Sequence, residues 1–145
     1  MSLFGGLKIS ASALSAERLR LNTIAENIAN AETTRTATGG PYRRQQVVLA
    51  EAPVEATGGL GPAASGWPSG SGVQALAVQE DPGPPRLVYD PSHPEANAEG
   101  YVPMPNVDLP AEMVDLMAAT RAYEANAVAY QAQRESQERT LELLA

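Results

Sequence analysis

The chain has 145 residues, a formal net charge of −7 and no cysteine. The negative charge disfavours binding to nucleic acid or to an anionic membrane surface, because both depend on neutralising negative groups. The absence of cysteine excludes disulfides and cysteine-ligated metals. Aromatic residues make up only 5% of the chain and much of the apolar fraction is alanine, so we expect a poorly filled core.

Proline and glycine divide the chain into three zones. All twelve prolines lie between Pro41 and Pro110, and ten of the twelve glycines lie between Gly39 and Gly100. Because proline interrupts helix interiors, we expect a mainly α fold: long helices in residues 1–31 and 107–145, and a small β or irregular middle segment in residues 32–106. No apolar run approaches the roughly 20 residues that cross a bilayer. The first residues also lack the basic and apolar regions of a cleaved signal peptide.

The N-terminal zone predicts a helix from about Leu7 to Ala31. An apolar residue recurs at every seventh position, which is the pattern of a helix that packs along another helix. These residues are Leu7, Leu14, Leu21 and Ile28. Charged residues at positions 17, 18 and 20 interrupt the stripe. The run Gly39-Gly40-Pro41 is expected to stop any helical continuation.

Three runs in the middle zone predict strands. They are "YRRQQVVLAEA" at 42–52, "VQALAVQE" at 73–80 and "RLVYD" at 86–90. Alternation of apolar and polar residues in the second run is typical of a half-buried strand. Between the first two runs, the composition of "TGGLGPAASGWPSGSG" at 57–72 predicts a flexible loop.

The C-terminal zone predicts a helix of about 35 residues, some 50 Å long. Asp108 is a candidate N-cap and Pro110 falls in the first turn, where its missing N–H is harmless. A second heptad pattern begins at Met113 and runs through residues 116, 120, 123, 127, 130, 134, 137, 141 and 144. A helix this long needs partners to cover it, so we expect it to pair with the first helix in the manner of a coiled coil.

His93 is the only histidine and has several acids near it in sequence: Asp90, Glu95, Glu99 and Asp108. A zinc or iron site needs three or four ligands, usually including more than one His or Cys. Pro91 and Pro94 favour a stiff turn here, and no catalytic triad can be assembled around one imidazole. We therefore interpret the segment as structural, and we predict no catalytic, metal-binding or cofactor-binding residues and no enzymatic activity.

Several motifs carry a resemblance to a known family. The segment "NIANAETT" at 27–34 resembles the N-terminal signature of flagellar rod, hook and hook-associated axial proteins. The motifs "YDPSHPEANAEGYV", "PNVD", "EMVDL" and "RAYEAN", within residues 87–131, resemble the C-terminal half of flagellar basal-body rod protein C, a family of proximal-rod subunits. "YRRQQVVL" at 42–49 is similar to a strand of the same family. The matching residues include Asn27, Ala29, Asn30, Tyr89, Asp90, Pro91, His93, Pro94, Gly100, Tyr101, Pro105, Asn106, Val107, Glu112 and Met113.

The resemblance implies a structural subunit of the bacterial flagellar basal body. Such subunits assemble helically, with copies of themselves and with other rod proteins, into a hollow drive shaft that transmits motor torque. It further implies a periplasmic location, export by the flagellar type III apparatus without a cleaved signal peptide, and contacts with basal-body ring and export-apparatus proteins. No nucleic acid, small-molecule substrate, cofactor or transmembrane segment is expected. We expect the helical core of the assembly to be formed by Leu7, Leu14, Leu21, Ile28, Met113, Leu116, Tyr123, Tyr130, Leu141 and Leu144.

Two alternatives remain open from the residues alone. The heptads would also suit a soluble helical adaptor or chaperone, which would form a discrete dimer or tetramer. A small metal-dependent hydrolase centred on His93 would contain stoichiometric metal.

Overall fold

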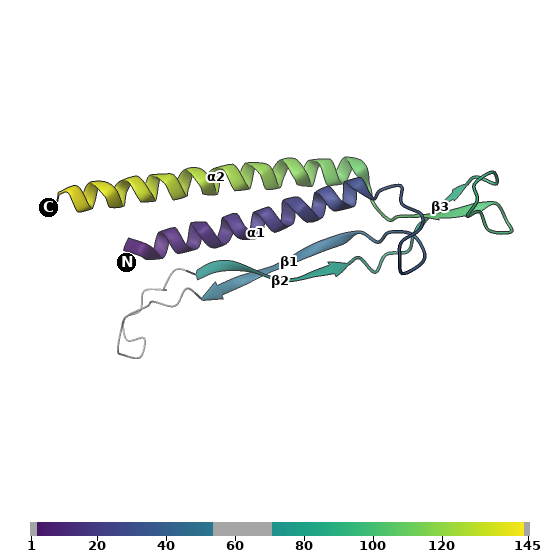
Figure 1. Ribbon diagram of the computed structural model, residues 1–145, viewed down its shortest axis with the longest axis horizontal. Coiled ribbons are helices and arrows are strands. Elements are labelled where there is room, and N and C mark those ends of the chain that lie inside the picture. The colour runs from purple at the N-terminus through teal and green to yellow at the C-terminus, as the bar shows by residue number, and fades with distance from the viewer. Residues whose placement is uncertain (1–2, 54–70, 144–145) are drawn as a thin grey trace.

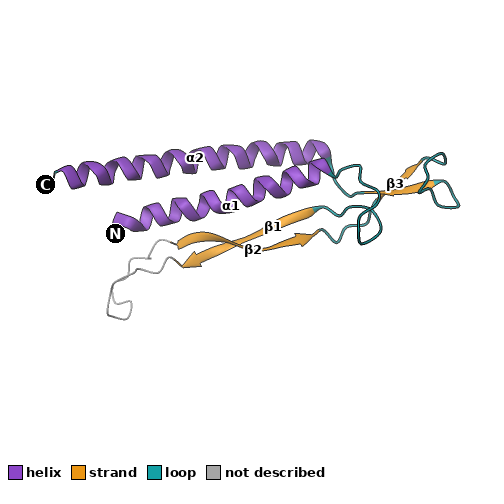
Figure 2. Cartoon of the chain, viewed as in Figure 1, coloured by secondary structure: helices purple, strands orange, loops and turns teal. Residues whose placement is uncertain are grey.

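The computed structural model describes residues 3–53 and 71–143 and shows an elongated molecule with two long helices (Figure 1). In chain order the elements are α1 (Leu3–Ala29), β1 (Gln45–Pro53), β2 (Ser71–Glu80), β3 (Arg86–Tyr89), β4 (Tyr101–Met104) and α2 (Leu109–Glu142). The predicted mainly α fold with a small β middle segment is confirmed (Figure 2). No helix in the described ranges is both long enough and apolar enough to cross a membrane.

The elements form three layers, with α1 in the middle (Figure 1). Helix α2 packs along one side of α1, and the antiparallel ribbon β1–β2 packs along the other side. Within the described part of the chain, α2 contacts no strand. The predicted pairing of the two helices is therefore confirmed, but the ribbon that covers the far side of α1 was not anticipated.

Helix α1 begins at Leu3 and ends at Ala29, earlier at both ends than the predicted span of 7–31. Gly5 and Gly6 lower helix propensity, which is why the sequence favoured a later start. In the structure, a Cβ at Gly6 would lie only 3.1 Å from the side chain of Gln133, so α2 comes close to α1 at this point. Gly39 and Gly40, with φ near +80°, form a separate turn well after the helix has ended.

The ribbon β1–β2 is fixed to α1 near both of its ends. At one end the Ser12 hydroxyl accepts a hydrogen bond from the backbone N–H of Val73 at 3.0 Å. At the other end the side chain of Asn27 bonds to the backbone of Gln45. Between them a β-bulge at Val48/Leu49 shifts the register. The flexible loop predicted at 57–72 lies outside the described residues, except that residues 71–72 begin β2.

The strands β3 and β4 form a hairpin that extends beyond the helices (Figure 1). The sequence predicted a stiff turn after β3 and missed β4, because Pro103 disfavours a strand assignment. The backbone N–H of Asp90 donates to the carbonyl of Gly100 at 2.9 Å. Leu87 lies opposite Pro103, and because hydrogen-bonded pairs alternate along an antiparallel ladder, this pair is not hydrogen-bonded. The proline nitrogen therefore faces away from its partner strand and no ladder bond is lost.

Helix α2 has 34 residues and is about 51 Å long at 1.5 Å per residue, against about 40 Å for α1. Asp108 is confirmed as the N-cap position, although its side chain makes no capping hydrogen bond. Pro110 lies in the first turn as predicted. Because Gln133 lies opposite Gly6, near the start of α1, the last turns of α2 extend past its partner.

The buried side of α2 follows a heptad pattern, but not the one predicted. The predicted stripe used Met113, Thr120, Ala127, Arg134 and Leu141 as one of its two rows. In the structure this row lies one residue earlier, and the positions turned inward are Glu112, Leu116, Ala119, Asn126, Tyr130, Gln133, Gln137 and Thr140. The prediction and the structure share the row at 116, 130 and 137. The row predicted to begin at Met113 was misplaced, because the row that is turned inward has polar or small side chains and gives no apolar signal.

The core is thin, as the composition predicted. In the described part of the chain the buried apolar residues are Ala16, Ile24, Ala31, Val102, Val107 and Ala119. Three of these six are alanines, which bury little area each. Buried polar residues therefore carry unusual weight in this fold. They are Ser10, Thr23, Asn27 and Glu112.

Candidate assembly site: a buried polar junction and an uncovered helix face

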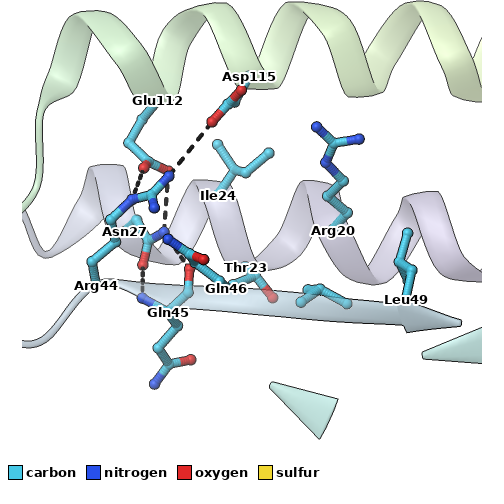
Figure 3. A pocket seen from close by; sticks show the side chains of 11 residues that line it. Arg20, Thr23, Ile24, Asn27, Arg44, Gln45, Gln46, Leu49, Glu112 and Asp115 are labelled. Carbon is cyan, nitrogen blue, oxygen red and sulfur yellow. Dashed lines mark hydrogen bonds and ion pairs between the residues drawn. The ribbon is translucent and has the colours of Figure 1, made fainter. Parts of the chain in front are cut away.

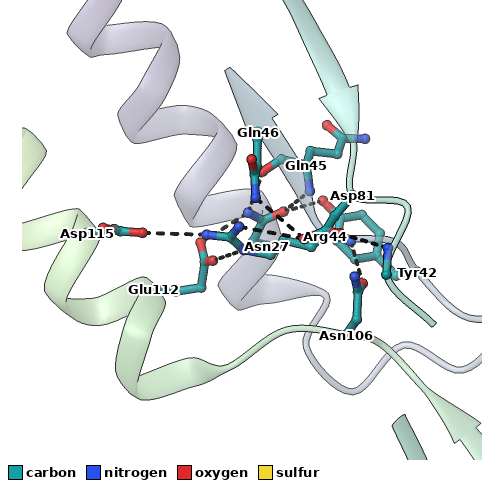
Figure 4. Close-up of polar contacts among 10 residues, drawn as sticks. Asn27, Tyr42, Arg44, Gln45, Gln46, Asp81, Asn106, Glu112 and Asp115 are labelled. Atoms are coloured by element: carbon teal, nitrogen blue, oxygen red, sulfur yellow. Dashed lines mark hydrogen bonds and ion pairs between the residues drawn. The ribbon is translucent and has the colours of Figure 1, made fainter. Parts of the chain in front are cut away.

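Five residues from three layers meet in one buried cluster, which we call the polar junction (Figure 4). Asn27 comes from the last turns of α1, and Glu112 from the first turn of α2. Tyr42, Arg44 and Gln45 come from the start of β1 and the residues before it. Asn27 is 1% exposed and Glu112 is 0% exposed. At this point the N-terminal helix, the ribbon and the C-terminal helix are joined.

The carboxamide of Asn27 uses all of its hydrogen-bonding capacity. Its Oδ1 accepts from the backbone N–H of Gln45 at 2.8 Å and from the Tyr42 hydroxyl at 3.0 Å. Its Nδ2 donates to the Gln45 carbonyl at 2.9 Å and to Glu112 Oε2 at 3.1 Å. Towards Gln45 the amide acts as a neighbouring strand would, because it bonds both the N–H and the C=O of one edge residue. Asn27 thus closes the β1 edge and binds α2 with the same side chain.

Arg44 completes the pairing of Glu112. Its Nε donates to Glu112 Oε1, while its terminal nitrogens lie 3.5 Å from Asp115 and 3.9 Å from Asp81. The Arg44 backbone is held as well: its N–H donates to Asn106 Oδ1 at 3.0 Å and its carbonyl accepts from the N–H of Asp81 at 2.7 Å. The charge of a buried carboxylate is thereby matched by a guanidinium, as burial requires.

The phenol of Tyr42 is perturbed by this environment. Burial raises the pKa of Tyr42 above its ordinary value of 10.0, and the nearby negative charges of Glu26, Glu112 and Glu80 raise that pKa further. Both effects favour the neutral phenol, which is the form that donates to Asn27. The junction thus holds Tyr42 as a hydrogen-bond donor.

A groove of about 380 Å³ opens beside the junction, between α1, β1 and the start of α2 (Figure 3). Arg20 and Asp115 line it together with four of the junction residues, Asn27, Arg44, Gln45 and Glu112. The groove contains charges of both signs, so it has no strong preference for an anionic or a cationic ligand.

The face of α2 that points away from α1 carries large apolar side chains near its N-terminal half. Their exposed fractions are between 54% and 66%. We call this the outer α2 face; its residues are Met113, Val114, Met117 and Val128. Apolar side chains gathered on one side of an otherwise polar helix are typical of a protein–protein contact.

The predicted assembly residues are distributed over both environments. Leu7, Leu14, Leu21 and Ile28 of α1 are half-buried, as are Leu116 and Tyr130 of α2. Met113, Tyr123 and Leu141 are exposed. Leu144 lies outside the described residues. The half-buried members are partly occupied in holding the single chain together, so the exposed members are the ones left for a neighbour.

The segment around His93 forms a rigid turn. Asp90 Oδ1 accepts hydrogen bonds from the Ser92 hydroxyl at 2.6 Å and from the Ser92 N–H at 3.0 Å, and these bonds lower the pKa of Asp90 below its ordinary 3.8. His93 Nδ1 accepts from the N–H of Glu95 at 3.2 Å. Among the described residues, no three His, Cys, Asp or Glu side chains come together in a way that could hold a metal ion.

The motif residues therefore divide into two groups. Asn27, Asn106 and Glu112 belong to or touch the polar junction, whereas Tyr89, Asp90, His93, Gly100 and Tyr101 shape the hairpin and its turn. The sequence interpretation missed Tyr42 and Arg44 as functional residues. A signal was present, because both lie in the "YRRQQVVL" block that carried part of the resemblance.

Comparisons with known proteins agree with this picture. A family model for the flagella basal body rod protein matches residues 7–35, and one for the C-terminal part of flagellar basal body rod FlgEFG proteins matches residues 98–143. The chain is 43% identical over 148 aligned residues to the flagellar basal-body rod protein FlgC of Bacillus subtilis, covering 99% of each chain. It is 42% identical to that of Borreliella burgdorferi, covering 87% of each. It is 44% identical to that of Salmonella typhimurium, covering 87% of this chain and 86% of the relative.

These similarities give no support to an adaptor or a hydrolase. The chain belongs to the flagellar basal-body rod protein FlgC family, and it is a structural subunit of the rod in the flagellar basal body.

Proposed function

We propose that this rod subunit acts mechanically, in the proximal part of the periplasmic rod. It assembles helically with copies of itself and with other rod proteins into a hollow shaft that transmits motor torque. Heterologous contacts, in which one surface of a subunit meets a different surface of the next, generate such open tubes. The subunit has no catalytic role in this proposal, and its work is to transmit force through packed helices.

The observation that carries the proposal is the outer α2 face. Met113, Val114 and Met117 are each more than half exposed, on a helix whose opposite side already packs on α1. Burying these side chains against a neighbour would contribute roughly 1.5–3 kcal/mol for each one fully covered. A helix of about 51 Å with one side uncovered is well suited to lie against further helices in a tube.

The remaining predicted assembly residues add contacts outside this face. Tyr123 and Leu141 are exposed on α2, but at 3.6 residues per turn they lie on the side of the helix that carries Leu116 and Tyr130, so they would meet a neighbour along the border of the α1 contact. The half-buried leucines of α1 would contribute the area that α2 leaves uncovered. We include them in the proposed core of the shaft, with Met113 and Met117 as its strongest members.

Export and partners complete the proposal. We infer that the chain reaches the periplasm through the flagellar type III apparatus without a cleaved signal peptide. On its way into the rod it would meet export-apparatus proteins, and in place it would face the basal-body rings. The family membership supports assembly within the basal body, and these specific partners follow from the location proposed here.

The test replaces the rod gene of a motile strain with this gene carrying Met113→Glu and Met117→Glu. We expect swimming in soft agar to be lost and rods to be missing from isolated basal bodies, because two charges would be forced into the contact. The purified double variant should keep its helix content by circular dichroism, since both side chains are exposed in the single chain.

The matched control is Ser136→Glu, which adds a charge at an exposed α2 position outside the apolar face. It should leave motility intact. Normal swimming of the Met113→Glu, Met117→Glu strain would contradict the proposed contact. Polar substitutions at Leu14 and Leu116 test the rest of the core, but these residues are half-buried, so the helix content of those variants must be measured as well.

A further inference from the structure

The seam between α1 and α2 repeats every seven residues. On α1 the half-buried residues Leu7, Leu14, Leu21 and Ile28 recur at that spacing, and on α2 the inward row passes through small or polar side chains such as Asn126 and Gln133. A slide by one heptad, about 10 Å along the axis, brings the same kinds of side chain together again. It would therefore be only weakly opposed by apolar packing.

One position in the seam does distinguish the alignments. Glu112 is the only acidic residue in the inward row of α2, and its two oxygens bond Arg44 and Asn27. A slide of seven residues would put Ala119 or Pro105 at this level. The buried carboxamide would then lose the carboxylate that accepts from its Nδ2, Arg44 would lose the acceptor of its Nε, and Glu112 would lose both of these partners. Unpaired buried polar groups carry a large penalty.

The same cluster aligns the third layer. Asn27 bonds both backbone groups of Gln45 on the outward edge of β1. Moving β1 by one residue along α1 would offer Asn27 an edge residue whose N–H and C=O point the other way, because these groups alternate along a strand. One carboxamide thus contacts the ribbon and α2 at the same time.

We propose that the polar junction sets the register of the molecule: it fixes how far α2 and β1 lie along α1. The residues responsible are Asn27, Arg44 and Glu112. Apolar packing supplies attraction between the layers, and the junction selects one alignment among several of similar packing. Polar residues buried in helical seams are known to select register in this way, at some cost in stability. This role is a property of the single chain and is independent of rod assembly.

The experiment exploits the absence of cysteine from the chain. One thiol is introduced as Ser10→Cys, whose hydroxyl lies 3.5 Å from Gln133. It is combined with Gln133→Cys to report the observed register, and with Asn126→Cys or Thr140→Cys to report slides of seven residues. The purified full chain is treated at low concentration with dibromobimane, which fluoresces on joining two thiols. The Ser10→Cys thiol is common to all pairs, so its accessibility does not affect their comparison.

In the otherwise unaltered chain we expect the 10–133 pair to react and the two shifted pairs to stay at background. In a chain that also carries Asn27→Leu, Arg44→Met and Glu112→Leu, the shifted pairs should rise by about tenfold or more relative to the 10–133 pair. The matched control carries Arg134→Met and Glu138→Leu, which remove an exposed ion pair of α2. It should keep the original pattern.

Two results would overturn the proposal. The first is cross-linking of the 10–133 pair alone in the triple variant, or no cross-linking of that pair in the parent. The second is loss of helix content by circular dichroism in the triple variant, because the junction would then be needed for folding itself and not for choosing an alignment. Neither result depends on whether the chain enters a rod.

Discussion

Glu112 is a carboxylate that is buried with specific hydrogen-bond partners. It is wholly buried, and each of its carboxylate oxygens has its own partner: Arg44 on one and Asn27 on the other. The buried charge of Glu112 is therefore balanced within the fold. Removing one of these three residues leaves polar groups of the other two without a partner, which costs stability.

Replacing Glu112 with leucine should reduce the free energy of unfolding by about 3–5 kcal/mol, because Arg44 and Asn27 lose their shared acceptor. Glu138→Leu serves as the control. It removes a carboxylate that is 57% exposed and paired with Arg134, so a loss of only about 0–1 kcal/mol is expected. Urea unfolding followed by circular dichroism measures both. Equal losses for the two variants would show that burial of Glu112 has no energetic consequence.

Tyr42 should make stability depend on alkaline pH. Burial and neighbouring carboxylates raise the pKa of Tyr42 in the folded chain above 10.0. The unfolded chain therefore loses this proton first, so the stabilisation is present below pH 10.0 and declines as pH rises through the folded pKa. The Tyr42→Phe variant has no phenol to titrate at this position. We expect the difference in unfolding free energy between parent and Tyr42→Phe to shrink above about pH 10; a constant difference would refute this.

The sequence could name Asn27 and Glu112 as motif residues but could not bring them together. They are 85 positions apart in the chain, and no periodicity links a helix near one end to a helix near the other. Arg44 lies in a strand-like run with another arginine beside it, and only the folded chain shows which of the two turns inward. Buried polar contacts between distant segments are set by tertiary packing, which local patterns do not encode.

At the scale of elements, the β3–β4 hairpin depends on one glycine. Gly100 has a φ of +85°, and a Cβ there would lie 2.9 Å from Tyr89 Cε2. Tyr89 in turn packs edge-on against Tyr101, with ring centroids 5.3 Å apart. The backbone conformation and the aromatic pair both require a residue without a side chain at this position.

Gly100→Ala should therefore destabilise the hairpin by about 1–3 kcal/mol. Gly39→Ala is a close control, because Gly39 also has a φ of +85° but a Cβ there would meet nothing within 4 Å. The control reports backbone strain alone, and the excess loss in Gly100→Ala reports the clash with Tyr89. Amide hydrogen exchange measures the local loss of protection, at residues 86–104 for Gly100→Ala and at residues 33–42 for Gly39→Ala. Equal losses at the two sites would mean that Tyr89 moves aside freely.

The elements themselves were largely predictable, and the exceptions have physical causes. Proline and heptad spacing located both helices, and three strand-like runs located β1, β2 and β3, with alternation noted only for β2. Strand β4 was missed because Pro103 argues against a strand unless its nitrogen faces outward. One row of the α2 stripe was misplaced because Glu112 and Asn126 occupy inward positions where apolar residues are expected. No pattern in the sequence predicted that the β1–β2 ribbon packs on α1.

The whole molecule is longer on one side than on the other. Helix α2 continues past the start of α1, and residues 138, 139, 141, 142 and 143 at its end are exposed. These last turns contribute little to the stability of the single chain, because they bury little surface.

Deleting residues 138–145 should therefore change the free energy of unfolding by no more than about 0.5 kcal/mol, while motility of a strain carrying the shortened gene should be lost. Urea unfolding and soft-agar swimming measure the two effects separately. A large loss of stability would show that the end of α2 belongs to the fold of the monomer. Normal swimming would remove Leu141 from the proposed assembly contact.

Both ends of the described chain lie at the same end of the molecule, and the β3–β4 hairpin lies at the opposite end (Figure 1). The subunit is therefore directional, with the two ends of the described chain at one end and the β3–β4 hairpin at the other. If subunits stack in one common orientation, the resulting column also has a direction, and its two terminal surfaces are unlike. An incoming subunit can then distinguish the growing end from the base by shape alone.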